Sequence, residues 1–218
     1  GYSLDNQEEL LHDQGKWIEL INRYLKINKG MKVLDLGCGP GFFSVMLTNL
    51  GCQVIGIDYS DKMLEEARNN ARKFKANVEF QKMDVQDLAF QDEIFDLIIT
   101  RNVTWNLEKP VQAYQEMVRV LKKQGHLLNI DGNHYYHYQD QDYSRAGHSD
   151  HQHMEGIDVS IIDNIAKELK LSYVLRPQYD IEILKEIGFQ QVESQILSKE
   201  KTKEGKELIR QFLIHAIK

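Results

Sequence analysis

Cysteine and proline are scarce in this chain of 218 residues, which has two cysteines and three prolines. Two cysteines provide no disulfide framework, so we expect a reduced, cytoplasmic setting. No apolar run approaches the ~20 residues that a membrane span requires, and no signal-peptide pattern is present. Neither a membrane protein nor a secreted protein is expected.

Basic residues are also fewer than acidic ones. The chain has 27 Lys and Arg residues against 33 Asp and Glu residues, a formal net charge of −6. Binding to nucleic acid normally requires a basic patch that displaces counterions from phosphates, and the lysines here are scattered. The composition disfavours a nucleic-acid substrate and favours a small molecule, and it leaves the oligomeric state open.

Glycine is concentrated in one segment, V-L-D-L-G-C-G-P-G, at residues 33–41. Its first four residues are typical of a short buried strand, and residues 42–50 predict the helix that follows. Glycines in such a turn allow positive φ and a close approach of a ligand to the backbone. A second apolar run ends at Asp58, 21 residues after Gly37, where a nucleotide-binding β-α-β unit holds an acid for ribose hydroxyls. The pattern predicts a site for an adenosine-containing cofactor.

The spacing of these glycines discriminates between cofactors. A dinucleotide site has G-x-G-x-x-G, whereas Phe42 occupies the place of the third glycine and the spacing here is G-x-G-x-G. Asp35 stands two residues before the first glycine, and its carboxylate would repel a pyrophosphate. An ammonium or sulfonium ligand suits this acid better, so an NAD-dependent oxidoreductase is disfavoured.

Four landmarks follow one another at the ends of predicted strands: the glycine segment, Asp58, Asp84 and the run F-D-L-I-I-T-R-N from Phe95. In these features the chain resembles the class I S-adenosylmethionine-dependent methyltransferases, most closely over residues 30–130. The resemblance implies S-adenosyl-L-methionine as the cofactor, S-adenosyl-L-homocysteine as the product, and methyl transfer to a small-molecule acceptor.

Alternating strand and helix patterns predict a parallel sheet built of β-α-β units. With the resemblance, the expected fold is an α/β three-layer sandwich around a mostly parallel seven-stranded sheet with an antiparallel C-terminal strand. We expect a single domain over residues 1–218. It would carry an N-terminal helix at about residues 4–27 and a substrate-side insertion at about residues 131–178.

The resemblance also assigns roles in binding the cofactor. Asp58 would accept hydrogen bonds from the ribose hydroxyls, and Asp35 would face the methionyl ammonium. Asp84 would meet the adenine amino group, with the Val85 amide nearby. The cofactor-binding residues expected are Asp35, Gly37, Gly39, Asp58, Tyr59, Met63, Asp84, Val85 and Arg101.

Several of these residues also have a purely structural interpretation. Asp58 could cap the next helix, Asp84 could stabilise a turn, and Met63 could belong to the core. Arg101 follows the fourth strand at the switch point of the sheet, where it could pair with the cofactor carboxylate or form a surface ion pair. Trp105 could line the acceptor site or pack beneath the next helix.

Five of the eight histidines lie between residues 131 and 153, where relatives build the acceptor pocket. Histidines beside carboxylates can act as general bases or as metal ligands. We take His134 and His137 as candidate general bases and assign no metal site, because the H-x-x-H spacings are loose. A polar surface loop would show a similar composition. Further along, Asp180 is expected to cap a short helix that ends at Gly188.

The leading hypothesis is therefore an S-adenosylmethionine-dependent methyltransferase that uses in-line displacement on a small-molecule acceptor. Two alternatives remain open. One is another S-adenosylmethionine-dependent group transfer, such as aminopropyl transfer. The other is a non-catalytic protein that senses S-adenosylmethionine or a metal through the histidine-rich segment.

Overall fold

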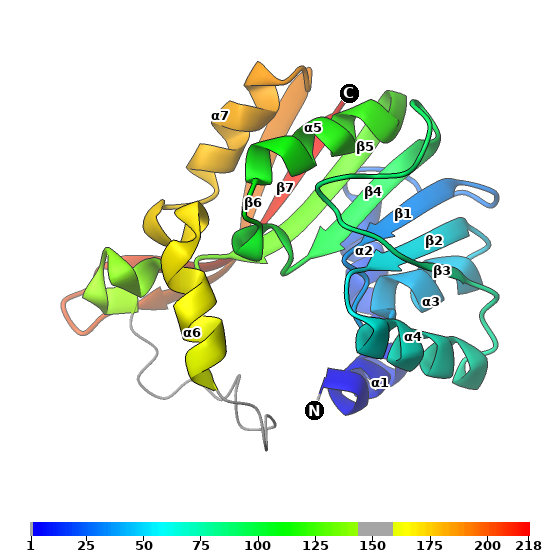
Figure 1. Ribbon diagram of the computed structural model, residues 1–218, viewed down its shortest axis with the longest axis horizontal. Coiled ribbons are helices and arrows are strands. Elements are labelled where there is room, and N and C mark those ends of the chain that lie inside the picture. The colour runs from blue at the N-terminus through cyan, green and yellow to red at the C-terminus, as the bar shows by residue number, and fades with distance from the viewer. Residues whose placement is uncertain (1, 144–158) are drawn as a thin grey trace.

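A computed structural model describes residues 2–143 and 159–218 as helices packed on both faces of one seven-stranded sheet (Figure 1). The strands are β1 (Lys32–Leu36), β2 (Gln53–Asp58), β3 (Glu79–Lys82), β4 (Phe95–Arg101), β5 (Leu121–Gly132), β6 (Gln191–Lys201) and β7 (Glu207–Ile217). The helices are α1 (Tyr2–His12), α2 (Gln14–Asn22), α3 (Phe42–Asn49), α4 (Asp61–Lys73), α5 (Pro110–Val120), α6 (Val159–Glu168) and α7 (Gln178–Glu186). Short 3₁₀ turns are η1 (Thr104–Asn106), η2 (Tyr136–Tyr138), η3 (Gln141–Tyr143) and η5 (Lys170–Tyr173).

The strand order is β3-β2-β1-β4-β5-β7-β6. Strands β1 to β5 pair in parallel, and β7 is antiparallel to both of its neighbours. The chain reverses direction across the sheet after β3, so β1 and β4 are neighbours at the switch point. This topology confirms the expected mostly parallel sheet with an antiparallel C-terminal strand.

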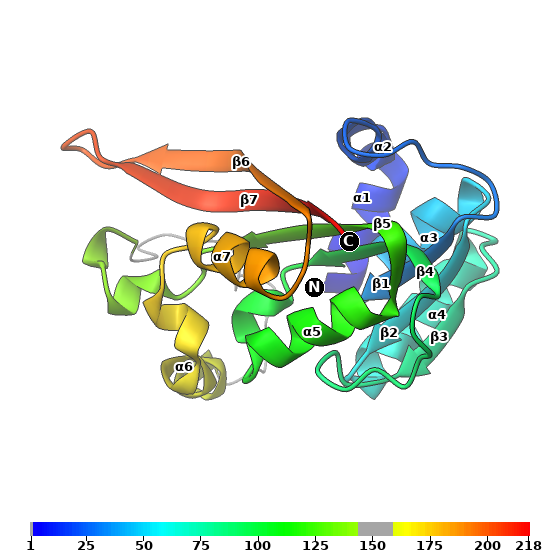
Figure 2. The same ribbon diagram turned by 90° about the horizontal axis from the view of Figure 1, so that it is seen from above.

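Two hydrophobic clusters cover the two faces of the sheet. Helices α5 and α7 pack on one face through residues that include Tyr114, Met117 and Leu184. Helices α1, α2 and α3 pack on the other through residues that include Leu10 and Phe43. Figure 2 shows α5 and α7 on the opposite side of the sheet from α1 and α2. Burial on both faces explains why β1 and β4 are almost continuously apolar.

The N-terminal region differs from the single helix expected at residues 4–27. The structure has two helices, α1 and α2, separated at Asp13. Apolar periodicity continues through the break, which is why the sequence pattern indicates one stripe. Among the residues that the structure describes, the predicted insertion after β5 contains η2, η3, α6 and η5. Residues 144–158, including His148, His151 and His153, lie outside the described residues. Among the described helices, none is both long enough and apolar enough to span a bilayer.

Candidate functional site

The glycine loop between β1 and α3 has left-handed backbone at residues where a side chain would be strained. Gly37 has φ of 68° and Gly39 has φ of 52°. A Cβ at Gly37 would lie 2.3 Å from Cγ2 of Val103, which follows β4. Gly37 is therefore required both by its φ angle and by the close approach of the β4 loop.

Asp58 is held by two backbone amides, one in the glycine loop and one at the start of α4. Its Oδ2 accepts a hydrogen bond from the Gly39 amide at 2.9 Å, and its Oδ1 accepts one from the Ser60 amide at 2.9 Å. The cap of α4 is a different residue, since the Ser60 hydroxyl accepts from the Met63 amide. Asp58 thus joins the end of β2 to the glycine loop with a fixed orientation.

Asp35 is a buried carboxyl, 2% exposed, behind the glycine loop. Its Oδ2 accepts hydrogen bonds from the Ser44 amide at 2.8 Å and from the Ser44 hydroxyl at 2.6 Å. Burial raises the pKa of Asp35 to about 6, opposed by the Ser44 hydrogen bonds and by Arg101, and reinforced by the charge of Asp58. A cation bound beside Asp35 would favour its ionised form.

Arg101, at the end of β4, forms an ion pair with Glu9 of α1. The distances are 2.5 Å from Nη1 to Oε1 and 2.9 Å from Nη2 to Oε2, and both side chains are 23% exposed. The guanidinium also lies over Phe42, with 5.0 Å from Cζ to the ring centroid, and over Trp17 at 5.2 Å. The ion pair is half-buried. The sequence allowed two roles for Arg101, a surface ion pair or a contact with the cofactor carboxylate, and the observed pair with Glu9 does not decide between them.

The residues expected near the adenine lie beyond β2 and β3. Tyr59 is 73% exposed, and the Lys82 ammonium lies 5.8 Å from its ring centroid. The Asp84 Oδ1 accepts a hydrogen bond from the Gln86 amide at 2.8 Å, which is the turn interaction that the sequence also allowed. The Val85 side chain belongs to the core, so its expected contact with a ligand is limited to its backbone amide.

Aromatic rings form a row that runs over the loops after β4 and β5 and ends on η5. Trp105 lies 5.2 Å from the Tyr135 ring, Tyr135 lies 6.0 Å from Tyr138, and Tyr138 lies 5.7 Å from Tyr173. Both candidate bases border this row. His134 is 5.2 Å from the Trp105 ring, and His137 is 4.3 Å from Tyr138. The structure therefore brings His134 and Trp105 together at the switch-point edge.

A buried ion cluster beneath these loops was not expected from the sequence. Asp131, Arg176 and Asp180 are each at most 1% exposed, and Arg176 contacts both carboxylates. The prediction that Asp180 caps α7 is wrong, because Pro177 occupies the cap position and Asp180 binds Arg176 and the Tyr114 hydroxyl. Asp131 could have been found, since it ends the fifth strand as Asp58 ends the second.

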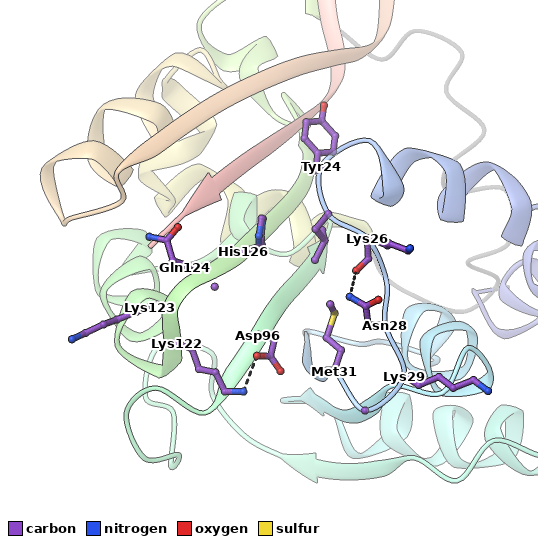
Figure 3. Close-up of a pocket in the computed structure, with 13 residues that line it drawn as sticks. Tyr24, Lys26, Asn28, Lys29, Met31, Asp96, Lys122, Lys123, Gln124 and His126 are labelled. Carbon is purple, nitrogen blue, oxygen red and sulfur yellow. Dashed lines mark hydrogen bonds and ion pairs between the residues drawn. The ribbon is translucent and has the colours of Figure 1, made fainter.

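A cavity of about 600 Å³ lies at the opposite edge of the sheet (Figure 3). It is lined by the segment that precedes β1 and by the amino-terminal parts of β4 and β5, including Met31, Asp96 and Gly125. Ligands of open parallel sheets bind at the carboxyl ends of the strands, so this cavity is separate from the candidate site. Within residues 2–143 and 159–218, no group of three His, Cys, Asp or Glu residues could hold a metal ion.

Comparison with known proteins places residues 27–170 in the family described as "Methyltransferase domain". A ubiquinone biosynthesis O-methyltransferase of Coxiella burnetii is 30% identical over 100 residues, 46% of this chain and 43% of the relative. A demethylmenaquinone methyltransferase of Listeria welshimeri is 32% identical over 120 residues, 53% of this chain and 51% of the relative. The chain thus spans about half the length of the curated relatives it matches.

Among solved structures, Haemonchus contortus phosphoethanolamine N-methyltransferase 2, in complex with S-adenosyl-L-methionine, superposes with a TM-score of 0.69. It is 18% identical, and the alignment covers 94% of this chain and 52% of that one. At this identity the likeness concerns the fold.

Proposed function

Because this chain belongs to the S-adenosylmethionine-dependent class I methyltransferases, we propose that it transfers a methyl group from S-adenosyl-L-methionine to a small-molecule acceptor. The observation that carries the proposal is the pairing of a left-handed glycine loop with two fixed carboxyls, Asp35 and Asp58. A buried carboxylate suits a ligand that carries an ammonium and a sulfonium, and would repel a pyrophosphate.

The residues around the glycine loop fit this cofactor. Asp58 is oriented by two backbone amides and would accept hydrogen bonds from the ribose hydroxyls. Asp35 would stabilise the methionyl ammonium, and Arg101 would receive the methionyl carboxylate once Glu9 releases it. Gly37 and Gly39 let the backbone approach the ligand.

Further along the edge, the remaining predicted residues would hold the adenine and the acceptor. Tyr59 and Met63 would pack against the adenosine, while Asp84 and the Val85 amide would meet the adenine ring. His134 and His137 would face the acceptor.

Bound S-adenosyl-L-methionine supplies an electrophilic methyl group on a positively charged sulfur, with a neutral thioether as leaving group. The protein therefore has no leaving group to protonate. Its contribution is to align donor and acceptor, which can supply several kcal/mol, and to accept a proton where the acceptor carries one. The aromatic row would supply apolar walls for the acceptor, and the bordering histidines would supply a proton acceptor.

A small acceptor agrees with the net charge of −6 and with the printed activities of the matched relatives, which concern ubiquinone biosynthesis and demethylmenaquinone. Incubation with methyl-labelled S-adenosyl-L-methionine and fractionated metabolite extract tests the proposal. Label should move into a small molecule, and Asp58→Ala should strongly reduce the transfer. Label found in methylthioadenosine would indicate transfer of the aminocarboxypropyl chain on sulfur instead of the methyl group. Cofactor binding without transfer to any fraction would favour a sensor.

A further inference from the structure

Asp131, at the carboxyl end of β5, connects two walls of the candidate acceptor site. Its carboxylate is fully buried. Oδ1 lies 3.2 Å from Nε2 of His134 and accepts from the Gly132 amide at 2.8 Å. Oδ2 accepts from the Trp105 amide at 2.9 Å. One carboxylate therefore contacts both the candidate base and the backbone of the aromatic wall.

Arg176 joins this carboxylate to a second one. Its Nη1 donates to Asp131 Oδ2 at 3.0 Å, and its Nε donates to Asp180 Oδ2 at 2.7 Å. The Thr104 hydroxyl lies between them, 2.5 Å from Asp131 Oδ2 and 2.6 Å from Arg176 Nη2. Asp180 also accepts from the Tyr114 hydroxyl. The cluster links β5, η1, α5 and α7 beneath the site.

Arg176 lies between two buried carboxyls, Asp131 and Asp180. Burial and Asp180 hold the pKa of the Tyr114 hydroxyl well above its usual value. For Asp131, burial alone would raise the pKa, but Arg176, His134 and Thr104 outweigh it and hold the pKa below its usual range. Asp131 is therefore ionised.

A buried net charge is costly unless an opposite charge lies close to it. Among the described residues that contact Asp131, His134 is the titratable group whose side chain is partly exposed, at 22%.

We propose that Asp131 is a positioning residue that holds His134 with its proton on Nε2, so that Nδ1 takes the proton of the acceptor. This inference rests on the proposed methyl transfer and deepens it. In the Nε2–H tautomer the imidazole lone pair is on Nδ1.

The inference restricts the class of acceptor. The acceptor must carry a proton that it loses, so it is a hydroxyl or an N–H group. As the acceptor atom gains the methyl group, the carbon–sulfur bond breaks and its electron pair stays on sulfur. The acceptor proton moves to His134. The positive charge lost from sulfur reappears on the imidazolium, so atoms and charge balance.

A purely structural role for the cluster predicts something different. An ion pair that only fastens α7 to β5 would leave the tautomer of His134 unconstrained. Ring-nitrogen NMR of protein labelled with ¹⁵N-histidine separates the two. The tautomers are read at a pH above which the ring-nitrogen signals no longer change, so that the rings are neutral. His134→Asn assigns the signal.

We expect His134 to carry its proton on Nε2 in the wild-type protein. A proton on Nδ1, or an even mixture of tautomers, overturns the inference without any further variant. Asp131→Asn should abolish the preference, because an amide can either donate or accept. Asp180→Asn is the matched control, since it removes a carboxylate from the same cluster without touching His134, and it should retain the preference. Equal changes in both variants, or none in either, also contradict the inference.

The His126–His215 pair, with 2.9 Å between ring nitrogens at the other edge of the sheet, reports whether each variant is folded. Calorimetry with S-adenosyl-L-homocysteine tests the proposed function separately. Failure to bind it would overturn the cofactor assignment while leaving the tautomer result intact.

Discussion

Glu9 of α1 binds Arg101 of β4 through both carboxylate oxygens, and the indole Nε1 of Trp17 donates to the same carboxylate at 2.9 Å. Helices α1 and α2 are thereby tied to the switch point of the sheet. The Glu9 carboxylate therefore binds the Arg101 guanidinium, which is the group proposed to bind the carboxylate of the cofactor.

Competition for Arg101 gives a first prediction. Glu9→Gln removes the competing charge, so the affinity for S-adenosyl-L-homocysteine should rise about 3- to 10-fold, equivalent to ~0.7–1.4 kcal/mol. Arg101→Gln should lower it by a similar factor. Isothermal calorimetry measures both. Weaker binding by Glu9→Gln would mean that α1 is needed to hold the ligand and that Arg101 is a structural residue.

The buried carboxyl of Asp35 predicts a pH dependence of cofactor binding. Its pKa is about 6 in the folded protein, so below pH 6 the carboxyl is increasingly protonated. A cationic ligand favours the ionised form. Affinity should therefore fall as the pH drops below 6, by up to about 10-fold per unit, and binding near pH 6 should release protons. Calorimetry in buffers of different ionisation enthalpy detects the release, which Asp35→Asn should abolish.

Asp35 also makes the stability of the folded protein depend on pH, and this dependence runs opposite to that of cofactor affinity. Its folded pKa lies above the unfolded value of about 3.9, so the folded state binds the proton more tightly. The stabilisation is complete below pH 4 and is lost as the pH rises through 6. Urea denaturation should show a smaller decrease in stability between pH 4 and pH 7 for Asp35→Asn than for the wild type.

Asp58 should contribute most of the ribose recognition. Asp58→Ala removes charge-assisted hydrogen bonds worth about 1.5–3 kcal/mol, so cofactor affinity should fall about 10- to 150-fold. Asp61→Ala is the control, because Asp61 is a nearby carboxylate that is 77% exposed and pairs with Lys82. Unchanged affinity in a folded Asp58→Ala variant would show that the ribose does not bind at Asp58.

The contact between Gly37 and Val103 can be tested by rescue. In Gly37→Ala the new Cβ would meet Val103 Cγ2 at 2.3 Å, and φ of 68° adds about 1 kcal/mol of backbone strain. Gly37→Ala with Val103→Ala relieves the clash but leaves the strain. The double variant should therefore regain part of the stability lost by Gly37→Ala, as read from urea midpoints. If the effects of Gly37→Ala and Val103→Ala on stability simply added in the double variant, the proposed clash between the two residues would be contradicted.

The buried Arg176 should be far more important for stability than a surface ion pair. Arg176→Gln leaves the carboxylates of Asp131 and Asp180 uncompensated, and loss of one partner of a buried pair costs about 3–5 kcal/mol. Lys199→Gln breaks a pair with Glu207 in which both side chains are about half exposed, and should cost at most about 1 kcal/mol. Similar unfolding midpoints for the two variants would contradict the prediction.

Sequence patterns predicted the sheet and the family because these depend on local features. The glycine loop, the acid after β2 and the apolar runs of β1 and β4 are each contained within a few residues. The strand order follows from the preference for short connections and right-handed β-α-β units, together with the resemblance.

The ion cluster could not be predicted in the same way. Asp131 and Arg176 are 45 residues apart in the chain, and a carboxylate or a guanidinium is ordinarily a surface residue. The residues around Asp180 in the sequence do not show whether it caps a helix or binds a buried partner, so the sequence led to the capping interpretation. Glu9 and Arg101 raise the same difficulty, since they meet only because α1 packs across α3. Apolar periodicity predicts helices and strands, but it does not predict which distant polar side chains become partners when these elements pack.

The position of β7 has a consequence for how the molecule is assembled. β7 lies between β5 and β6, so β5 acquires its second neighbour only when residues 207–217 are available. The half of the sheet from β3 to β4 has mostly local pairings and can form while the chain is still being synthesised. Until β7 arrives, one long edge of β5 is open to pairing with other chains. Loss of this last strand would therefore promote aggregation, even though every residue assigned to the cofactor would still be present.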